Sequence, residues 1–552
     1  MVSILIEVQI YKVVLDLQYI LFQCSHHSAL LHFQDVTYVK QALIFKQVYK
    51  KLVKIEYPME SFYLIDIIQR LNIEHYFVEE IKVALEKLYS ILNTNPNDFM
   101  SIHELYEVAL AFRLLRQGGH YVNADLFDSL KCNKRMFEEK HGEDVKGLVA
   151  LYEASQLSIE GEDSLNDLGY VCRELLHGWL SRHQEHNQAI YVANTLQNPL
   201  HYGLSRFMDK SAFIHDSKDE KDLLCLEELA KINSSIVRFM NQNETTEVSK
   251  WWNELELAKE VKFSGYQPLK WYTWPMACFT DPNFSEQRIE LTKPISLIYV
   301  IDDIFDVHGT LDQLTIFTDA INRWEITGTE QLPNFMKISL NALYEITSNF
   351  ADMVYKKHGF NPIDTLKKSW IRLLNAFMEE AHWLNSGHLP RAEDYLNNGI
   401  VSTGVHVVLV HAFFLLDHVH GITKETIDIL DEKFPNVIYS VAKILRLSDD
   451  LEGAKSGDQN GLDGSYLDCY MSEHQDISGE DVQRHVAHMI SNEWKRLNQE
   501  ILVANQFSSS FSNFCLNAAR MVPLMYHYKS NPSLSNLQEH VKSLINASGG
   551  CN

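Results

Sequence analysis

The chain has 552 residues, 46% of them hydrophobic, which is enough for two to four domains of ordinary size or for two large ones. Its 49 basic and 73 acidic residues give a formal net charge of −24, which argues against a nucleic-acid-binding protein. The eight cysteines show no CxxC or other metal-type spacing, so we expect reduced, mostly buried thiols.

The N-terminal stretch 1–21 is apolar, but Glu7, Lys12 and Asp16 interrupt it. It has neither the basic start of a secretory signal nor the arginines of a plastid transit peptide. No apolar run reaches the roughly 18 residues that a membrane-spanning helix needs. We therefore expect a cytoplasmic protein without a membrane span; the alternative is a plastid protein, if the true N-terminus carries a transit peptide.

Apolar residues recur at helical spacing from about residue 38 onward, and strand signals are scarce, so the chain is predicted to be all-α. The polar run 216–222 is the clearest boundary, between an N-terminal domain, 37–222, and a C-terminal domain, 223–552. Residues 1–36 match no pattern and are an unplaced extension. The predicted helices cover 61–71, 78–92, 102–117, 124–131, 145–154, 165–179, 223–240, 248–262, 335–355, 365–384, 404–416 and 437–447.

The stretch 295–309 combines an apolar helix with three carboxylates in its last turns. Pro294 is expected near the start of this helix and Gly309 just past its end. Asp302 and Asp306 are four residues apart and share one helix face, at the end where the helix dipole disfavours acids. A bound divalent cation would remove both the repulsion and the dipole penalty. The alternative is a solvated acidic helix end.

The stretch 436–453 repeats this design, since an apolar helix again ends in paired aspartates and then a glycine. Arg446 lies three residues before Asp449, so both side chains are on one face. Taken alone, this end would be a surface cap. Two acidic ends that faced each other across a helical bundle would instead hold several divalent ions, with Arg446 available for an anion.

These two motifs resemble those of the plant terpene synthases of the class I, metal-dependent type. The sequence DDIFD at 302–306 resembles the aspartate-rich motif of the family, and RLSDDL at 446–451 resembles the start of its second metal motif. The resemblance runs from about residue 38 to the C-terminus. Supporting stretches are RLLRQ at 113–117, LYEAS at 151–155, WWNEL at 251–255 and Trp324.

The resemblance implies a non-catalytic N-terminal helical barrel followed by a C-terminal class I helical bundle that binds a prenyl diphosphate. The proton-initiated cyclases of this superfamily use a DxDD motif, which the chain lacks, so ionisation by metal remains. The stretches 267–276 and 463–470, and a missing tandem-arginine motif, look like the subgroup that makes acyclic alcohols such as linalool and nerolidol. The implied activity is that of a carbon–oxygen lyase acting on geranyl or farnesyl diphosphate.

The resemblance also implies roles for individual residues. Asp302 and Asp306 would bind two of three Mg²⁺ ions, with Mn²⁺ as an alternative ion, and Asp303 would support them. Asp449 would bind the third ion, and Arg446 would hydrogen-bond the diphosphate. Trp274 is the candidate aromatic wall for an allylic cation, although core packing would also explain it. We expect a monomer whose partner is a small-molecule substrate.

The chain departs from the family pattern at several positions. In the second metal motif, glycines stand at 453 and 457; water can replace the hydroxyl lost at Gly453, and Asp458 is a candidate substitute for the acid lost at Gly457. Gly265 and Gln267 replace the two arginines that draw the diphosphate away, and the lid near 526–531 lacks its acidic glycine turn.

Three alternatives therefore stay open: a decayed or weakly active homologue, a synthase with a cyclic or olefin product, and a chain-elongating enzyme. The last needs a second complete DDxxD motif, which the sequence does not contain. The sequence EEAH at 379–382 is not a zinc HExxH motif, and we expect it to face solvent or the core.

Overall fold

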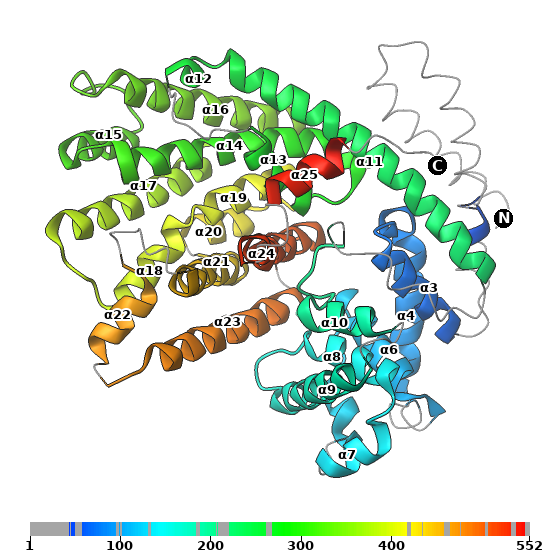
Figure 1. Cartoon of the computed structure of the whole chain (residues 1–552). Coiled ribbons are helices and arrows are strands. Elements are labelled where there is room, and N and C mark those ends of the chain that lie inside the picture. The colour runs from blue at the N-terminus through cyan, green and yellow to red at the C-terminus, as the bar shows by residue number, and fades with distance from the viewer. Residues whose placement is uncertain are drawn as a thin grey trace. The chain divides into compact units, whose positions relative to one another are not determined.

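The structure is a computed structural model of the whole chain, shown in Figure 1. Within its described residues every regular element is a helix, which confirms the all-α prediction. The described residues are 44, 46–49, 58–94, 99, 102–130, 134–183, 188–205, 207, 220–260, 268–416, 421–432, 434–456, 464–474, 476–502, 506–530 and 537–546.

The helices form two compact units, and the division between them falls between Met240 and Asn241, inside α11 (Glu220–Glu254). The sequence had suggested two helices here, 223–240 and 248–262. Helix α11 instead continues to Glu254, and the hydroxyls of Thr245 and Thr246 bond back to backbone carbonyls one turn earlier. The expected domain limit at 222/223 stays a prediction, since residues 208–219 lie outside the described residues.

The first unit is built around helices α6 and α8, whose side chains are buried almost throughout. The predicted segment 124–131 is not an α-helix: Asn123 bonds the backbone N–H of Asp125 and starts the tighter 3₁₀ helix η2 (Ala124–Leu130). The other predicted helices of this unit are present, with ends that differ by a few residues, and α7 and α10 were not predicted. The α-helices are α3 (Pro58–Arg70), α4 (Val78–Thr94), α6 (Leu105–Gln117), α7 (Lys134–His141), α8 (Val145–Ser155), α9 (Asp163–Arg182) and α10 (Ala189–Gln197).

The second unit surrounds one central helix, α19 (Val405–Leu416), of which only Val408 is not buried. Helices α14, α17, α21 and α24 all pack against α19 (Figure 1). The helices of this unit after α11 are α12 (Glu256–Glu260), α13 (Pro268–Cys278), α14 (Ser285–Asp303), α15 (Leu311–Arg323), α16 (Asn334–His358), α17 (Ile363–Ser386), α18 (Ala392–Ser402), α19, α20 (Lys424–Glu432), α21 (Asn436–Ser456), α22 (Tyr466–Glu473), α23 (Gly479–Leu502), α24 (Ser509–Ser530) and α25 (Leu537–Asn546).

A sharp turn separates α18 from α19 at Gly404, whose φ of +69° lies in the left-handed region. A Cβ atom at this position would lie 2.9 Å from Ile298 Cγ2, so the turn also packs tightly on α14. The segment Ala392–Leu416 across this turn has the length and hydropathy of a membrane-spanning helix. Its most apolar window is 83% buried in the folded chain, as expected for the core of a globular unit.

Both acidic helix ends differ from their expected form. Helix α14 begins at Ser285, so Pro294 lies inside it rather than near its start. Helix α21 passes Gly453 and ends at Ser456. In both cases tertiary packing outweighs the local preference of proline or glycine for a helix boundary. Pro294 and Gly453 therefore do not delimit these helices as the sequence suggested.

Candidate active site

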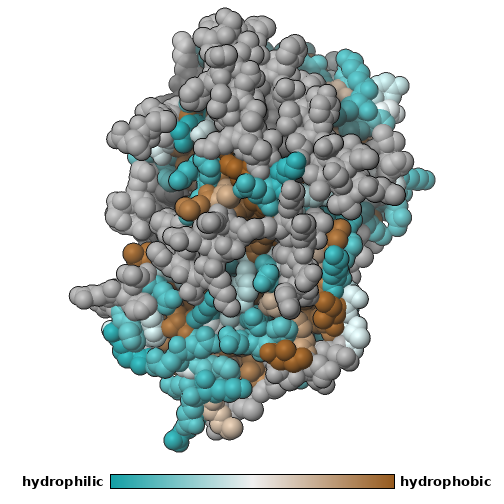
Figure 2. Space-filling model, turned by 90° about the vertical axis from the view of Figure 1, so that its right-hand side faces the viewer, coloured by the Kyte–Doolittle hydropathy of each residue, from teal (hydrophilic) through white to brown (hydrophobic). Residues whose placement is uncertain are grey.

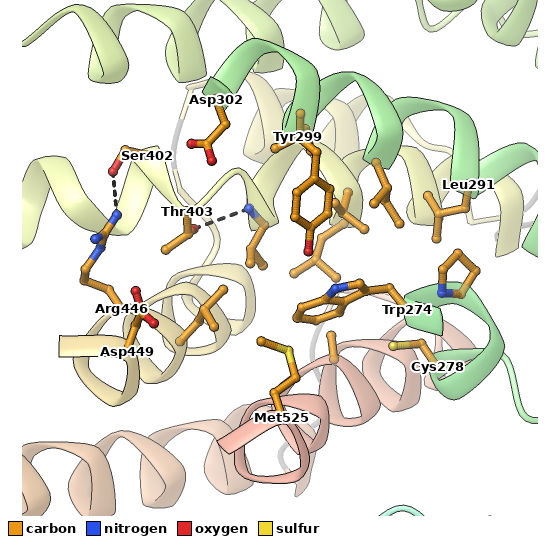
Figure 3. A pocket seen from close by; sticks show the side chains of 18 of the residues that line it. Trp274, Cys278, Leu291, Tyr299, Asp302, Ser402, Thr403, Arg446, Asp449 and Met525 are labelled. Carbon is orange, nitrogen blue, oxygen red and sulfur yellow. Dashed lines mark hydrogen bonds between the residues drawn. The ribbon is translucent and has the colours of Figure 1, made fainter. Parts of the chain in front are cut away.

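The second unit contains a cavity of about 340 Å³. Helices α13, α14, α19, α21 and α24 line it together with the turn after α18 (Figure 3). This volume is within the range of about 300–1,000 Å³ that is common for small-molecule sites. Its lining residues are Trp274, Pro275, Cys278, Leu291, Ile295, Ile298, Tyr299, Asp302, Ser402, Thr403, Val405, Val408, Leu409, Leu445, Arg446, Asp449, Phe514, Ala518, Met525 and Tyr526.

The charged lining residues gather at one end of this cavity. Figure 3 shows Asp302, Arg446 and Asp449 on one side, whereas Leu291 and Cys278 lie on the other. The cavity is thus polar at one end and apolar along the rest of its length. Such a shape suits a ligand with an anionic head and a hydrocarbon tail.

Asp302 lies in the last turn of α14, with its carboxyl group in the charged end of the cavity. Its pKa is raised to about 7, first by burial and then by the nearby carboxylates of Asp306, Asp303 and Glu380, whereas Arg446 lowers it. Among the described residues, no donor forms a hydrogen bond with Asp302. The ionised carboxylate is therefore poorly stabilised by the protein alone and would gain from a cation.

A π-helical turn, η4 (Ile304–His308), follows α14, and Gly309 N–H closes it on Ile304 C=O at 2.8 Å. This wider turn changes the four-residue relation on which the sequence prediction relied. Asp306 is exposed and Asp303 half-buried, and neither lines the cavity as Asp302 does. Asp306 still makes the largest electrostatic contribution to the raised pKa of Asp302, so the two carboxylates remain close.

Arg446 on α21 is held by several groups beside the cavity. Its Nε donates to Gly399 C=O at 3.1 Å and its Nη2 to Ser402 Oγ at 2.9 Å, while Nη1 lies 3.9 Å from Asp450 Oδ1. Ser402 Oγ in turn donates to Glu380 Oε1 at 2.6 Å. Burial would lower the pKa of Arg446, but Tyr395 and the surrounding carboxylates raise it, so the side chain stays cationic.

The two aspartates of α21 have different environments. Asp449 lines the cavity and accepts a hydrogen bond from Tyr526 Oη at 2.8 Å. Asp450 is buried and accepts hydrogen bonds from Tyr395 Oη at 3.2 Å and from Tyr466 N–H at 2.9 Å. Its pKa is raised to about 6, mainly by burial. Asp449 is therefore the ligand candidate, and Asp450 ties α21 to α18 and α22.

Trp274 lines the middle of the cavity, opposite α21, as the aromatic-wall prediction required (Figure 3). Burial raises the pKa of the nearby Tyr299 hydroxyl, and the indole N–H of Trp274 partly offsets this rise. Lys270 is on the same helix as Trp274, and its Nζ lies 4.5 Å from the ring centroid of Tyr299. This contact places a cation beside the helix turn that precedes Asp302.

The positions at which the chain departs from the family pattern lie only partly within the described residues. Gly453 lies within α21, and a Cβ atom there would meet no atom within 4 Å. Asp458, Gly457, Gly265 and Gln267 lie outside the described residues. The proposed lid falls partly outside them as well, because α24 is described to Ser530 but its side chains only to Tyr526.

The carboxylates fit a hard divalent cation. Among the described residues, no three histidine, cysteine or acidic side chains are grouped as a ready-made metal site. Mg²⁺ prefers one or two carboxylates together with water and substrate phosphates. Asp302 and Asp449, which both line the charged end of the cavity, can supply the carboxylates. The like charges that raise the pKa of Asp302 are a second sign that a cation belongs at this end.

Sequence reasoning gave no site role to Glu380 or Ser402, and it included Asp450 and Tyr526 only as parts of the second acidic end and of the lid. Glu380 was expected to face solvent or the core, but it bonds Ser402 and acts electrostatically on Asp302. Helical periodicity assigns a residue to a face of its own helix and does not say which helix that face meets. The one local signal was the paired acids at 379–380 within an apolar helix.

Comparison with known proteins gives two family matches. Residues 17–200 match the terpene synthase N-terminal domain, and residues 253–496 match the metal binding domain of the terpene synthase family. A protein of Glycine max named neryl diphosphate diphosphatase, chloroplastic, is 70% identical over 516 residues, which cover 93% of this chain and 96% of that protein. An (E)-nerolidol synthase of Cannabis sativa is 44% identical over 494 residues, 88% of each chain.

A solved structure agrees with these matches. Isoprene synthase of Populus x canescens, in complex with three Mg²⁺ ions and dimethylallyl-S-thiolodiphosphate, aligns with a TM-score of 0.83 and 29% identity. The alignment covers 92% of this chain and 96% of that protein. The metal binding domain implies a divalent metal, and members of the family are lyases that act on prenyl diphosphates. The chain belongs to the plant terpene synthase family.

Proposed function

We propose that this enzyme ionises a prenyl diphosphate and lets water capture the allylic cation, which gives an acyclic alcohol. Linalool would form from a ten-carbon substrate and nerolidol from farnesyl diphosphate. The observation that carries the proposal is one cavity whose charged end, with Asp302, Arg446 and Asp449, continues into an apolar, aromatic remainder. The names of the Glycine max and Cannabis sativa relatives, which refer to neryl diphosphate and nerolidol, support an acyclic product.

The charged end would bind the diphosphate. Asp302 and Asp306 would hold two of three Mg²⁺ ions with Asp303 beside them, and Asp449 would hold the third with water at Gly453 and with Asp458. Bound Mg²⁺ supplies Lewis-acid activation of the diphosphate leaving group. Arg446, already oriented by Gly399 and Ser402, would hydrogen-bond the diphosphate and stabilise its growing charge.

The apolar remainder would hold the hydrocarbon chain and keep most water out. Ile295, Ile298 and Leu409 offer no group that could attack a cation. The face of Trp274, which lines the cavity, would stabilise the allylic cation by about 0.5–2 kcal/mol. The product then depends on where a retained water molecule attacks the allylic system.

The test is an incubation of purified protein with geranyl, neryl or farnesyl diphosphate and Mg²⁺, followed by analysis of the volatile products. We expect an acyclic alcohol, and no alcohol above background when Mg²⁺ is chelated or Asp302 is replaced by alanine. A product that is mainly cyclic, or an olefin, would overturn the water-capture step. Diphosphate release without Mg²⁺ dependence would overturn the proposed ionisation.

The second candidate function is that of a decayed or weakly active synthase, because Gly457, Gly265 and Gln267 stand where the family has charged residues. Full activity of the unaltered protein would remove this candidate. Activity that appears only in Gly457→Glu would favour it. The variant Gly453→Ser restores the hydroxyl at a position where a Cβ atom meets no neighbour, so it tests the same motif without steric cost.

We propose that the enzyme is located in the plastid, although the sequence alone had suggested the cytoplasm. We also propose that it is a monomer. The Glycine max relative, 70% identical, is named as a chloroplastic protein, which supports the plastid alternative. Expression of the full-length gene product fused to a fluorescent protein tests this location. Diffuse cytosolic fluorescence would contradict it, and size-exclusion chromatography with light scattering tests the monomer.

A further inference from the structure

Cys278 and Phe514 line the apolar part of the cavity, and we propose that they limit the length of the prenyl chain that reacts. The inference rests on the proposed function and adds a residue-level basis for the choice between ten- and fifteen-carbon substrates. In Figure 3, Cys278 and Leu291 lie on the side of the cavity opposite Asp302 and Arg446. We call Cys278, Leu291 and Phe514 the floor of the cavity.

Helix α14 measures the length of the cavity, since both Leu291 and Asp302 line it. The separation of eleven positions between these residues corresponds to a rise of about 16 Å along the helix axis. A diphosphate bound through a metal ion begins about 4 Å from the carboxylate, because two metal–oxygen bonds of about 2 Å separate them. At most about 12 Å then remains for the rest of the diphosphate and the hydrocarbon chain together.

This length separates the two substrate classes. At about 1.2 Å per bond, an extended ten-carbon prenyl chain spans about 9 Å and a fifteen-carbon chain about 14 Å. The shorter chain can fit within this upper limit, whereas the longer chain exceeds it and must press against the floor or fold back. The floor therefore discriminates against a fifteen-carbon chain only if its side chains cannot retreat.

The floor is backed by closely packed aromatic side chains. The ring of Phe514 packs on Phe279 with a centroid distance of 4.6 Å, and Phe279 packs on Phe284 at 5.4 Å. Phe279 and Phe514 are buried, and Leu291 is 0% exposed. A close-packed aromatic layer of this kind has little free volume into which the floor could move.

Cys278 is the smallest of the three floor side chains, so this position offers the largest possible gain in side-chain volume. Asn517 Nδ2 donates to the backbone carbonyl of Cys278 at 3.1 Å, which fixes the position of the residue against α24. Burial raises the pKa of its thiol well above the ordinary range, so the side chain stays neutral and behaves as a small apolar group. A larger side chain here would shorten the cavity without a change of charge.

The experiment compares kcat/KM for farnesyl and geranyl diphosphate in Cys278→Leu, Phe514→Leu and the unaltered protein with Mg²⁺. We expect Cys278→Leu to lower the farnesyl-to-geranyl ratio by about 10–200-fold, the usual discrimination for about one methylene group of misfit. Phe514→Leu should shift the ratio in the opposite direction, since it removes ring volume from the floor. The matched control Cys225→Leu, on α11 in the first unit, should leave the ratio unchanged.

Binding measurements keep the inference separate from the proposed function. The unreactive geranyl and farnesyl S-thiolodiphosphates bind without ionisation, so their ratio of Kd values reports the floor even if the protein forms no alcohol. Equal Kd ratios in all variants, together with unchanged melting temperatures, would contradict the proposed role of the floor in selecting the chain length. If Cys278→Leu does not fold, Phe514→Leu and the smaller change Cys278→Val decide the question. Absence of turnover with an intact shift in Kd ratio would overturn only the proposed function.

Discussion

The two units each contain a cluster of buried charges, and the two clusters are balanced differently. In the first unit, Arg70 and Arg113 face Asp66 and Glu153. Arg70 Nη2 lies 2.6 Å from Glu153 Oε2, and Arg70 Nε lies 2.8 Å from Asp66 Oδ1. Burial alone would raise the pKa of Asp66, but the two arginines lower it below its ordinary value. The two positive and two negative charges of this cluster balance each other.

In the second unit, the cluster around Asp302 has an excess of negative charge. Asp306, Asp303 and Glu380 all raise the pKa of Asp302, and Arg446 alone opposes them. Buried charge is therefore not by itself a sign of function. A balanced cluster stabilises a fold or specifies its packing, whereas an unbalanced one in a cavity marks a place for a missing counter-ion. On the face drawn in Figure 2, the coloured residues include both hydrophilic and hydrophobic groups.

The largest expected effect is the loss of activity in Asp302→Asn, which removes a ligand charge from the unbalanced cluster. We expect kcat/KM to fall by about 10⁴-fold, or about 5.5 kcal/mol of transition-state stabilisation. The metal-free protein should be no less stable than the unaltered one, because a repelled carboxylate is gone. Steady-state kinetics and thermal melting with EDTA measure the two effects. The exposed Asp312→Asn is the matched control, and equal activity in both variants would refute the ligand role.

The second prediction breaks the balanced cluster. Glu153→Gln leaves the two buried arginines with one carboxylate, and the free energy of unfolding should fall by about 3–5 kcal/mol. Chemical denaturation measures this loss, while kcat/KM well below the melting temperature should stay the same. In the control Glu143→Gln, the lost partner is Arg182 in an exposed ion pair, so stability should hardly change. A Glu153→Gln protein as stable as its parent would show that the balance is unimportant.

The third prediction concerns the pH dependence of stability without metal. The folded-state pKa of Asp302, about 7, lies above its unfolded value of 3.8, so between these values the folded state binds more protons. Stability should therefore decrease as pH rises from about 4 to 7, by about 1–3 kcal/mol in total, and then level off.

Melting temperatures across this range, with EDTA or with Mg²⁺, test the pH dependence. Mg²⁺ should remove most of the decrease, because it favours the ionised carboxylate. Asp302→Asn should keep only the smaller part that comes from Asp450, whose pKa is raised to about 6. A stability that rises with pH over the same interval in EDTA would contradict the unbalanced cluster.

The smallest effect is expected for Tyr526→Phe, which removes the hydrogen bond to Asp449. The apparent affinity for Mg²⁺ should weaken by about 3–10-fold, corresponding to about 1 kcal/mol for one hydrogen bond. The Mg²⁺ dependence of kcat measures it at saturating substrate. Tyr344→Phe, which loses a hydrogen bond to the Ala320 carbonyl away from the cavity, should show no such shift. Equal shifts in both variants would count against an orienting role for Tyr526.

The sequence predicted the elements of this architecture better than their connections. The apolar helices and the two acidic stretches were visible in the periodicity, and Asp302, Arg446, Asp449 and Trp274 do line one cavity. The π-helical turn after Asp303 was not visible, because a five-residue hydrogen-bond pattern has no simple residue signature. Ligand roles for these residues stay predictions until metal binding is measured.

Long-range partners were the other gap. Glu380 reaches the site from α17 and Tyr526 from α24, each far along the chain from the residue it contacts. Helical spacing predicts neighbours three or four residues apart, and tertiary packing decides the rest. Pro294 shows the same limit, since a residue that usually begins a helix was accommodated in its middle by the surrounding core.

The central position of α19 has a consequence for how the chain folds. This helix, the most apolar of the described helices, is covered only when α14, α17, α21 and α24 are all in place, and the last of these ends more than a hundred residues later. Contacts between such distant segments form slowly. Until then, the segment Ala392–Leu416 exposes an apolar surface long enough to associate with other chains. Efficient production of the enzyme should therefore depend on chaperones that hold this segment until α24 has been synthesised.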